Sequence, residues 1–121
     1  ADTLTLGTAL ASGNSIDLGS GSDKITLGAV THTGTIANAE TIVGGTGADT
    51  ITVSTLLSKG SVDLGTGSDK LTLGNFANLA TVSGVETLAG GTAADTLTLG
   101  TGLATTKQYP IATRGIGFPR R

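Results

Sequence analysis

The sequence predicts an all-β fold made of repeated strand units, and three observations point to it. A 46-residue repeat runs through most of the 121 residues. Short segments alternate aliphatic residues with Thr or Lys directly after glycine turns. The composition has 20 Gly but only two Phe, one Tyr and no Trp or Met, so Leu, Ile, Val and Ala must supply the core.

The repeat is visible in two pairs of segments. Residues 15–28 recur as 61–74, and residues 40–52 recur as 86–98. We therefore expect a repetitive domain over residues 1–103, with two coils per 46-residue repeat. Residues 104–121 leave the pattern and form a separate segment.

Within the repeat, four segments share the form G-x-(G/A)-x-D-x-U-x-U, where U is aliphatic. A fifth segment, residues 1–6, resembles the end of another such unit. Each predicts a glycine turn leading into a short strand with aliphatic residues on one face. In chain order the four are residues 19–27, 45–53, 65–73 and 91–99.

Charge separates the two parts of the chain. Residues 1–103 contain all nine acidic residues and three lysines, whereas residues 104–121 contain four basic residues and no acid. Four basic residues are too few for a nucleic-acid arm, so we expect the tail to cap the last coil or to make an assembly contact.

Several classes of function are disfavoured. The chain has no Cys and a single histidine, His32, which leaves neither a thiolate nor an imidazole cluster for zinc. No G-x-S-x-G motif accompanies its Ser residues, and its Gly-x-Gly turns open no helix that would hold a nucleotide. We therefore predict that the segment is not an enzyme, that it has no transmembrane segment, and that His32 is a polar surface residue of a loop.

The glycine turns resemble a known calcium-binding family. Residues 44–52 fit the nonapeptide G-G-x-G-x-D-x-U-x of the RTX, or haemolysin-type, repeat at every defined position. In the other three turns Leu18 and Leu64 replace the first glycine and Ala93 replaces the third. Over residues 1–103 the resemblance implies a right-handed parallel β-roll, or β-solenoid, that binds Ca²⁺ between stacked turns. It also implies a secreted bacterial protein of the type I secretion class.

Spacing suggests where the turns lie. The interval from Asp23 to Asp49 equals that from Asp69 to Asp95, and both are longer than the interval from Asp49 to Asp69. All three exceed the two nonapeptides that separate stacked turns in the regular family repeat. We interpret this as a ladder on one edge, with residues 29–34 and 54–60 as loops on the other edge. Consecutive turns would then form three calcium sites. The expected metal-binding residues are Gly19, Gly21, Asp23, Gly45, Gly47, Asp49, Gly65, Gly67, Asp69, Gly91 and Asp95.

The chemistry of these turns suits calcium, which prefers hard oxygen ligands from carboxylates and backbone carbonyls. Stacked aspartates would repel one another without an ion, so folding should depend on the metal. The alternative is that each Asp only caps its turn through a hydrogen bond. Asp17, Asp63, Glu40 and Glu86 are expected to be solvated strand positions, with a role as additional ligands as the alternative.

Threonine forms a second regular pattern. We expect Thr5, Thr26, Thr52, Thr72 and Thr98 in one outward file, beside Thr3, Lys24, Thr50, Lys70 and Thr96. Such files resemble ice-binding faces of giant bacterial adhesins, but Lys interrupts one file and Thr is also an ordinary strand residue.

Together these patterns predict a calcium-binding structural module of a secreted bacterial surface or extracellular protein, such as a surface layer, a fibre or an adhesin. Its partners would be calcium ions and further copies or components of the assembly. The alternative is an ice- or carbohydrate-binding Thr face.

Overall fold

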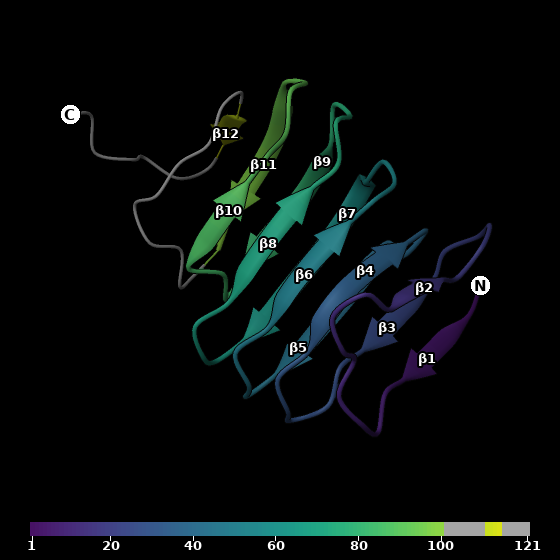
Figure 1. The fold of residues 1–121 in the computed structure, drawn as a ribbon. Coiled ribbons are helices and arrows are strands. Elements are labelled where there is room, and N and C mark those ends of the chain that lie inside the picture. The colour runs from purple at the N-terminus through teal and green to yellow at the C-terminus, as the bar shows by residue number, and fades with distance from the viewer. Residues whose placement is uncertain (101–110, 115–121) are drawn as a thin grey trace.

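The computed structural model describes residues 1–100 and the strand formed by residues 111–114, and these are all β-strands, turns and loops (Figure 1). The described residues contain no helix able to span a membrane. The strands are β1 (Thr3–Thr5), β2 (Ser15–Asp17), β3 (Lys24–Thr26), β4 (Thr33–Ala37), β5 (Thr41–Gly45), β6 (Thr50–Val53), β7 (Ser58–Gly65), β8 (Lys70–Leu73), β9 (Leu79–Ser83), β10 (Thr87–Ala89), β11 (Asp95–Leu99) and β12 (Ile111–Arg114).

The strands form two parallel sheets, and the chain alternates between them. Sheet A has the order β1-β3-β5-β7-β9-β11-β12, and sheet B has the order β10-β8-β6-β4-β2. Between β1 and β11, each strand pairs with the next strand of its own sheet, so register partners such as Lys24 and Thr41 are one coil apart in the sequence. The predicted parallel β-solenoid is therefore confirmed, with about five coils.

The two edges of the solenoid are defined by the direction of the chain. At edge 1 the chain passes from sheet A to sheet B, as between β5 and β6. At edge 2 it returns from sheet B to sheet A, as between β2 and β3. The two edges lie on opposite sides of the core.

The 46-residue repeat spans two and a half coils, not the expected two. Ile16 lies in β2 of sheet B, whereas its repeat equivalent Val62 lies in β7 of sheet A. The same exchange relates Ile25 in β3 of sheet A to Leu71 in β8 of sheet B. Equivalent residues of the two repeats therefore occupy opposite sheets and opposite edges.

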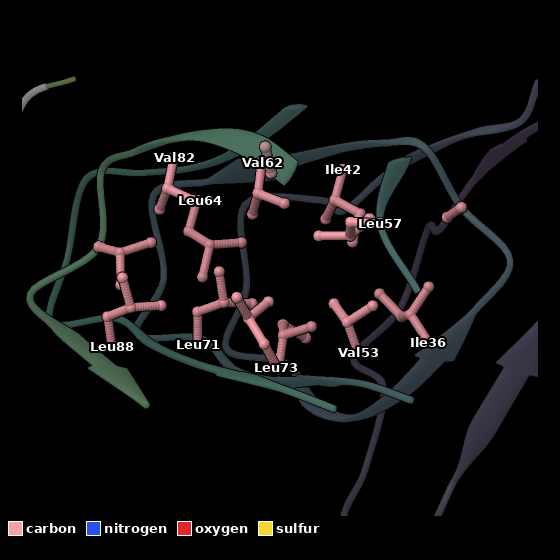
Figure 2. Close-up of a cluster of buried hydrophobic side chains, with 14 of the residues drawn as sticks. Ile36, Ile42, Val53, Leu57, Val62, Leu64, Leu71, Leu73, Val82 and Leu88 are labelled. Carbon is pink, nitrogen blue, oxygen red and sulfur yellow. The ribbon is translucent and has the colours of Figure 1, made fainter. Parts of the chain in front are cut away.

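The core is a column of aliphatic side chains between the two sheets (Figure 2). Ile25, Ile42 and Val62 follow one another in register across sheet A and are at most 1% exposed. Leu71 and Leu88 do the same in sheet B. Each such burial stabilises the fold by roughly 1.5–3 kcal/mol. Among the described residues, Leu, Ile, Val and Ala form this core, as the composition predicts.

The predicted threonine files are divided between the two faces. Thr5 and Thr26 pair in sheet A, whereas Thr52 and Thr72 pair in sheet B. The cause is again the half coil in the repeat, which moves equivalent residues to the other sheet. The single array expected from the sequence is therefore wrong.

The non-repeat tail contributes one strand to the described structure. β12 pairs in parallel with β11, and Ile111 is the register partner of Asp95. The remaining residues of the predicted tail, 104–110 and 115–121, lie outside the described residues.

Candidate functional site

The four glycine turns lie on both edges of the solenoid. The turns that end at Asp49 and Asp69 connect β5 to β6 and β7 to β8, at edge 1. The turns that end at Asp23 and Asp95 connect β2 to β3 and β10 to β11, at edge 2. The predicted one-sided ladder is therefore wrong.

The spacing explains the error. The interval from Asp49 to Asp69 is one coil, but the two longer intervals, from Asp23 to Asp49 and from Asp69 to Asp95, are one and a half coils. Each longer interval contains three strands and not two, because it includes β4 or β9, and β4 begins within residues 29–34, which were predicted to form a loop. Of the three predicted inter-coil sites, only the one between Asp49 and Asp69 has its two turns on adjacent coils.

The two stacked turns at edge 1 are in backbone contact. Gly45 is the register partner of Gly65, and the Thr66 N–H donates to the Gly45 carbonyl at 3.1 Å. A Cβ placed on Gly67 would lie 2.4 Å from the Gly47 carbonyl oxygen. Only glycine therefore allows the two turns to approach this closely, with their carbonyl oxygens between coils.

Side chains link the coils along edge 1 in one direction. Each carboxylate accepts a hydrogen bond from the backbone of the preceding coil: the Asp49 N–H donates to Asp69 Oδ1 at 2.7 Å, and the Asp69 N–H donates to Glu86 Oε1 at 2.7 Å. Upstream, the His32 N–H donates to Asp49 Oδ1 at 2.9 Å, and the Leu10 N–H donates to His32 Nδ1 at 3.0 Å. We call this series the edge 1 ladder.

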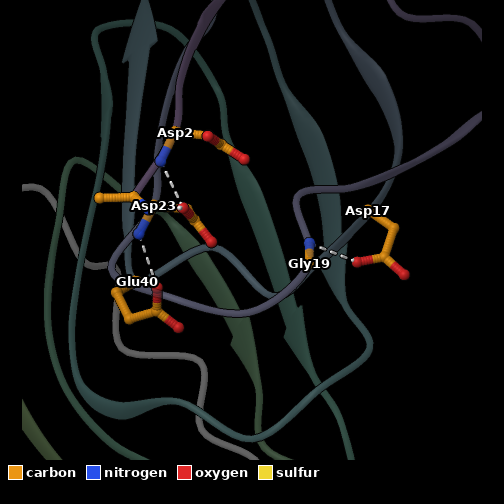
Figure 3. A network of polar contacts seen from close by, with 6 residues as sticks. Asp2, Asp17, Gly19, Asp23 and Glu40 are labelled. Atoms are coloured by element: carbon orange, nitrogen blue, oxygen red, sulfur yellow. Dashed lines mark hydrogen bonds and ion pairs between the residues drawn. The ribbon is translucent and has the colours of Figure 1, made fainter.

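Edge 2 carries an equivalent series, the edge 2 ladder. The Asp2 N–H donates to Asp23 Oδ1 at 2.5 Å, and the Asp23 N–H donates to Glu40 Oε2 at 2.8 Å (Figure 3). This repeats the arrangement of Asp49, Asp69 and Glu86 on the opposite edge. Further along edge 2, the Leu57 N–H donates to Asn78 Oδ1 at 2.9 Å, and the Asn78 N–H donates to Asp95 Oδ1 at 3.0 Å.

The second oxygen of each ladder aspartate is buried without a partner. The Oδ2 atoms of Asp23, Asp49, Asp69 and Asp95 make no hydrogen bond to any described residue, and the four residues are at most 2% exposed. A buried, ionised carboxylate oxygen is costly unless a cation or a proton compensates it. The N-terminal ammonium of Ala1 lies 3.7 Å from Asp23 Oδ1 and compensates that carboxylate. Among the described residues no such ion pair serves Asp49, Asp69 or Asp95, so these three carboxylates favour a bound cation or a proton.

The environment of the edge 1 ladder shifts its titration. Burial raises the pKa of the Asp49 carboxyl, opposed by the hydrogen bond from the His32 backbone. Burial also raises the pKa of Asp69, opposed by the hydrogen bond from Asp49, and the Asp49, Glu86 and Asp63 carboxylates raise it further. Both groups therefore favour the protonated form more than a solvated aspartate does.

We predict that lowering the pH stabilises the metal-free chain. The folded-state pKa values of Asp49 and Asp69 lie above the unfolded value. Between these two values the folded state therefore binds more protons than the unfolded state. Their contribution to stability is thus lost as pH rises through the folded pKa values. Urea unfolding in chelator should give a stability that falls as the pH rises from about 4, just above the unfolded value of 3.8, to 7, and Asp49→Asn/Asp69→Asn should remove much of this fall. An unchanged pH dependence in this variant would contradict the assignment.

The acidic side chains do not converge as a ready metal cluster. Within residues 1–100 and 111–114, no three His, Cys, Asp or Glu side chains are grouped in a way that could hold an ion. An ion at the stacked turns would therefore depend on two carboxylates, Asp49 and Asp69, together with backbone carbonyl oxygens. This donor set of hard oxygens fits calcium and excludes a site built on side chains alone.

His32 belongs to the ladder, so the predicted surface position is wrong. The residue is fully buried, and since its Nδ1 accepts a hydrogen bond from Leu10, its proton lies on Nε2, 3.3 Å from the Gly28 carbonyl oxygen. Its equivalent in the second repeat is the buried Asn78. The sequence indicates a shared role, because the two polar residues are 46 residues apart and occupy the same position of the repeat. The prediction of a loop over residues 29–34 led instead to a surface position for His32.

This equivalence predicts the outcome of two substitutions. His32→Asn should retain most of the stability, because Asn78 accepts the same type of backbone hydrogen bond at the equivalent position. His32→Ala should destabilise the fold by about 1–3 kcal/mol, because the buried Leu10 N–H loses its acceptor. Urea unfolding of both variants measures the difference, and equal losses would contradict a ladder role.

The other acidic positions have local roles. Asp17 Oδ1 accepts hydrogen bonds from the Asn38 side chain at 2.6 Å and from the Gly19 N–H at 2.9 Å, and these bonds lower its pKa in that order. Asp63 Oδ1 accepts a hydrogen bond from the Gly65 N–H at 3.0 Å. Both carboxylates are exposed turn caps. By contrast, Glu40 and Glu86 are half-buried and accept hydrogen bonds in the ladders. The prediction that these two residues are solvated strand positions is therefore wrong.

Comparison with protein-family models, curated proteins and solved structures gives no match to this chain.

Proposed function

We propose that this chain is a calcium-binding structural module, in which Ca²⁺ between stacked glycine turns stabilises the solenoid. The observation that carries the proposal is the set of four buried aspartate oxygens without partners. The raised pKa values of Asp49 and Asp69 support it, because a divalent cation favours the ionised form that burial disfavours.

The best site lies between the two stacked turns of edge 1. Asp49 and Asp69 would provide the carboxylates, and the glycine carbonyls of both turns would complete the oxygen set. At edge 2, Asp23 and Asp95 are separated by several coils, so each could share an ion only with its own neighbours. The proposal is therefore one complete site at edge 1 in place of three on a single edge.

The biological setting is proposed from the resemblance of the glycine turns to RTX repeats. On that basis the module belongs to a secreted bacterial protein at the cell surface or in an extracellular assembly. A rigid solenoid with exposed polar faces suits a structural role in a surface layer, a fibre or an adhesin, and none of the described residues requires a catalytic role.

Isothermal titration of the metal-free chain with calcium tests the proposal. We expect binding with at least one site per chain, lost in Asp49→Asn/Asp69→Asn. The matched control is Asp2→Asn/Asp17→Asn, which removes the same charge from two exposed carboxylates at edge 2 and should retain binding. Absence of calcium binding, or equal loss in both variants, would refute the site.

A second candidate function rests on the outward face of sheet B. We infer that this face could bind an ordered ligand such as ice or a glycan, because it is rich in threonine and has one charged residue among its central positions. Thermal hysteresis in the presence of calcium, compared with Thr52→Lys, tests it; a value no greater than that of the variant rejects it. The register aligns Thr35, Thr52 and Thr72 in one file, and Thr33, Thr50, Lys70 and Thr87 in the next.

A further inference from the structure

The first and last strands of the repeat domain have the same sequence. Residues 1–8 and residues 94–101 both read Ala-Asp-Thr-Leu-Thr-Leu-Gly-Thr. Both segments supply a strand to sheet A, β1 and β11, and both strands start at edge 2. The chain therefore carries the same strand near its two ends.

The two strands have complementary neighbours. β1 is the end strand of sheet A and pairs with β3, where Thr3, Leu4 and Thr5 are the register partners of Lys24, Ile25 and Thr26. β11 pairs with β9 on one side. On its other side, where a further coil of the repeat would stack, lies β12.

The direction of the hydrogen bonds allows β11 to replace β1. In β11 the Thr96 and Gly100 N–H groups point to β9. The N–H groups of Leu97 and Leu99 therefore point to the other side of the strand, away from β9. In β1 the equivalent of Leu99 is Leu6, whose N–H donates to the Thr26 carbonyl in β3 at 2.9 Å. The side of β11 that points away from β9 thus has its N–H groups at the same positions as the side of β1 that pairs with β3.

We propose that a second copy of this chain joins here by strand exchange: β11 of one copy takes the place of β1 on β3 of the next copy. Leu97 would then lie beside Ile25, and the Asp95 N–H would donate to Asp23 Oδ1 as the Asp2 N–H does now. Two strands must leave for this exchange: β12, which pairs with β11 of the first copy, and β1, which pairs with β3 of the receiving copy.

The exchange also joins the two ends of sheet B. With β11 in the position of β1, the open edge of β10 in one copy faces the open edge of β2 in the next. At the N-terminal end, Ile16 of β2 and Leu18 after it are only partly buried against the core, so the neighbouring β10 would cover apolar surface there. Both sheets then continue across the junction.

β12 differs in sequence from β3, the strand of the next copy that would pair with the same side of β11. Where β1 has Lys24, Ile25 and Thr26 as its register partners, the equivalent positions of β11 have Ala112, Thr113 and Arg114. β12 thus continues the hydrogen bonding of sheet A without the repeat sequence. Because such pairing is heterologous and all strands are parallel, release of β12 leads to an open, head-to-tail filament and not to a closed dimer.

Crosslinking tests the exchange, since the chain has no cysteine. In the double variant Thr26→Cys/Thr98→Cys, the two thiols of one chain lie four strand spacings apart, about 19 Å. In the exchanged filament Thr98 lies beside Thr26 of the next copy, within reach of a short thiol crosslinker. To release β12 we add Ala112→Pro and Thr113→Pro, because proline cannot donate to the sheet.

We expect a ladder of crosslinked dimers, trimers and longer species from this quadruple variant, and at least fivefold less from the chain with intact β12. The control pair Thr52→Cys/Thr98→Cys, with the same two prolines, should give no ladder because Thr52 lies in sheet B. A monomer in every variant, with β-sheet circular dichroism retained, overturns the proposal, and so does an equal ladder from the control pair.

A second measurement does not depend on the proline variant. A labelled peptide of residues 94–101 should bind the chain that lacks residues 1–8, and Leu97→Asp in the peptide should reduce binding at least tenfold. No binding to this chain while it keeps its β-sheet signal overturns the proposal. The inference deepens the assembly part of the proposed function but not its calcium part, so both tests are run with calcium and with chelator: exchange without calcium binding refutes only the latter.

Discussion

Gly65→Ala should cost at least about 3 kcal/mol of the free energy of unfolding. Gly65 has φ +85°, a left-handed conformation that costs a residue with a Cβ about 1–3 kcal/mol. The new Cβ would also lie 2.1 Å from the Gly45 carbonyl oxygen, so the stacked turns must separate. Since a small domain has only about 5–15 kcal/mol of stability, we expect partial or complete unfolding.

Two other glycines separate these effects. Gly13→Ala introduces the strain of a positive φ, +90°, at a position with no atom within 4 Å of the new Cβ. Gly7→Ala introduces neither the strain nor a contact. Urea unfolding should therefore rank the losses Gly65 > Gly13 > Gly7, and a Gly65 loss no larger than that of Gly13 would show that the two turns do not need close contact.

The sequence predicted the local unit of this fold but not its placement. Each glycine turn and the strand after it are contiguous in the sequence, so periodicity and turn chemistry are sufficient to identify them. The edge on which a turn lies depends on how many strands lie between it and the preceding glycine turn: an even number keeps the edge and an odd number changes it. The segment from Ile25 to Ile42 contains β4. The sequence of this strand is rich in Thr and Gly, so it was not distinguished from a loop.

The same reasoning applies to the ladders. Asp23, Asp49, Asp69 and Asp95 were identified because they belong to a motif. The side chains of His32 and Asn78 accept backbone hydrogen bonds as these aspartates do, but the two residues belong to no complete motif, and their role appears only when coils of unequal length are stacked. Contacts between residues a full coil apart in the sequence fix that role, and local periodicity does not reveal such contacts.

Calcium should raise the melting temperature of the chain strongly. An ion that binds only the folded state, at 100 times its dissociation constant, adds about 2.7 kcal/mol per site. For a domain of this size about 1 kcal/mol shifts the melting temperature by roughly 4–8 °C, so one site should add about 10–20 °C. Thermal unfolding followed by circular dichroism, with calcium and with chelator, measures the shift.

Asp49→Asn/Asp69→Asn should reverse the order of stability between the two conditions. In chelator the variant should melt at or above the temperature of the unsubstituted chain, because a neutral amide replaces a buried carboxylate whose pKa burial raises. In calcium it should melt well below it, because the variant no longer gains from the ion. If chelator leaves the melting temperature of the unsubstituted chain unchanged, the four buried oxygens are accommodated by protonation, and the solenoid stacks its turns without metal.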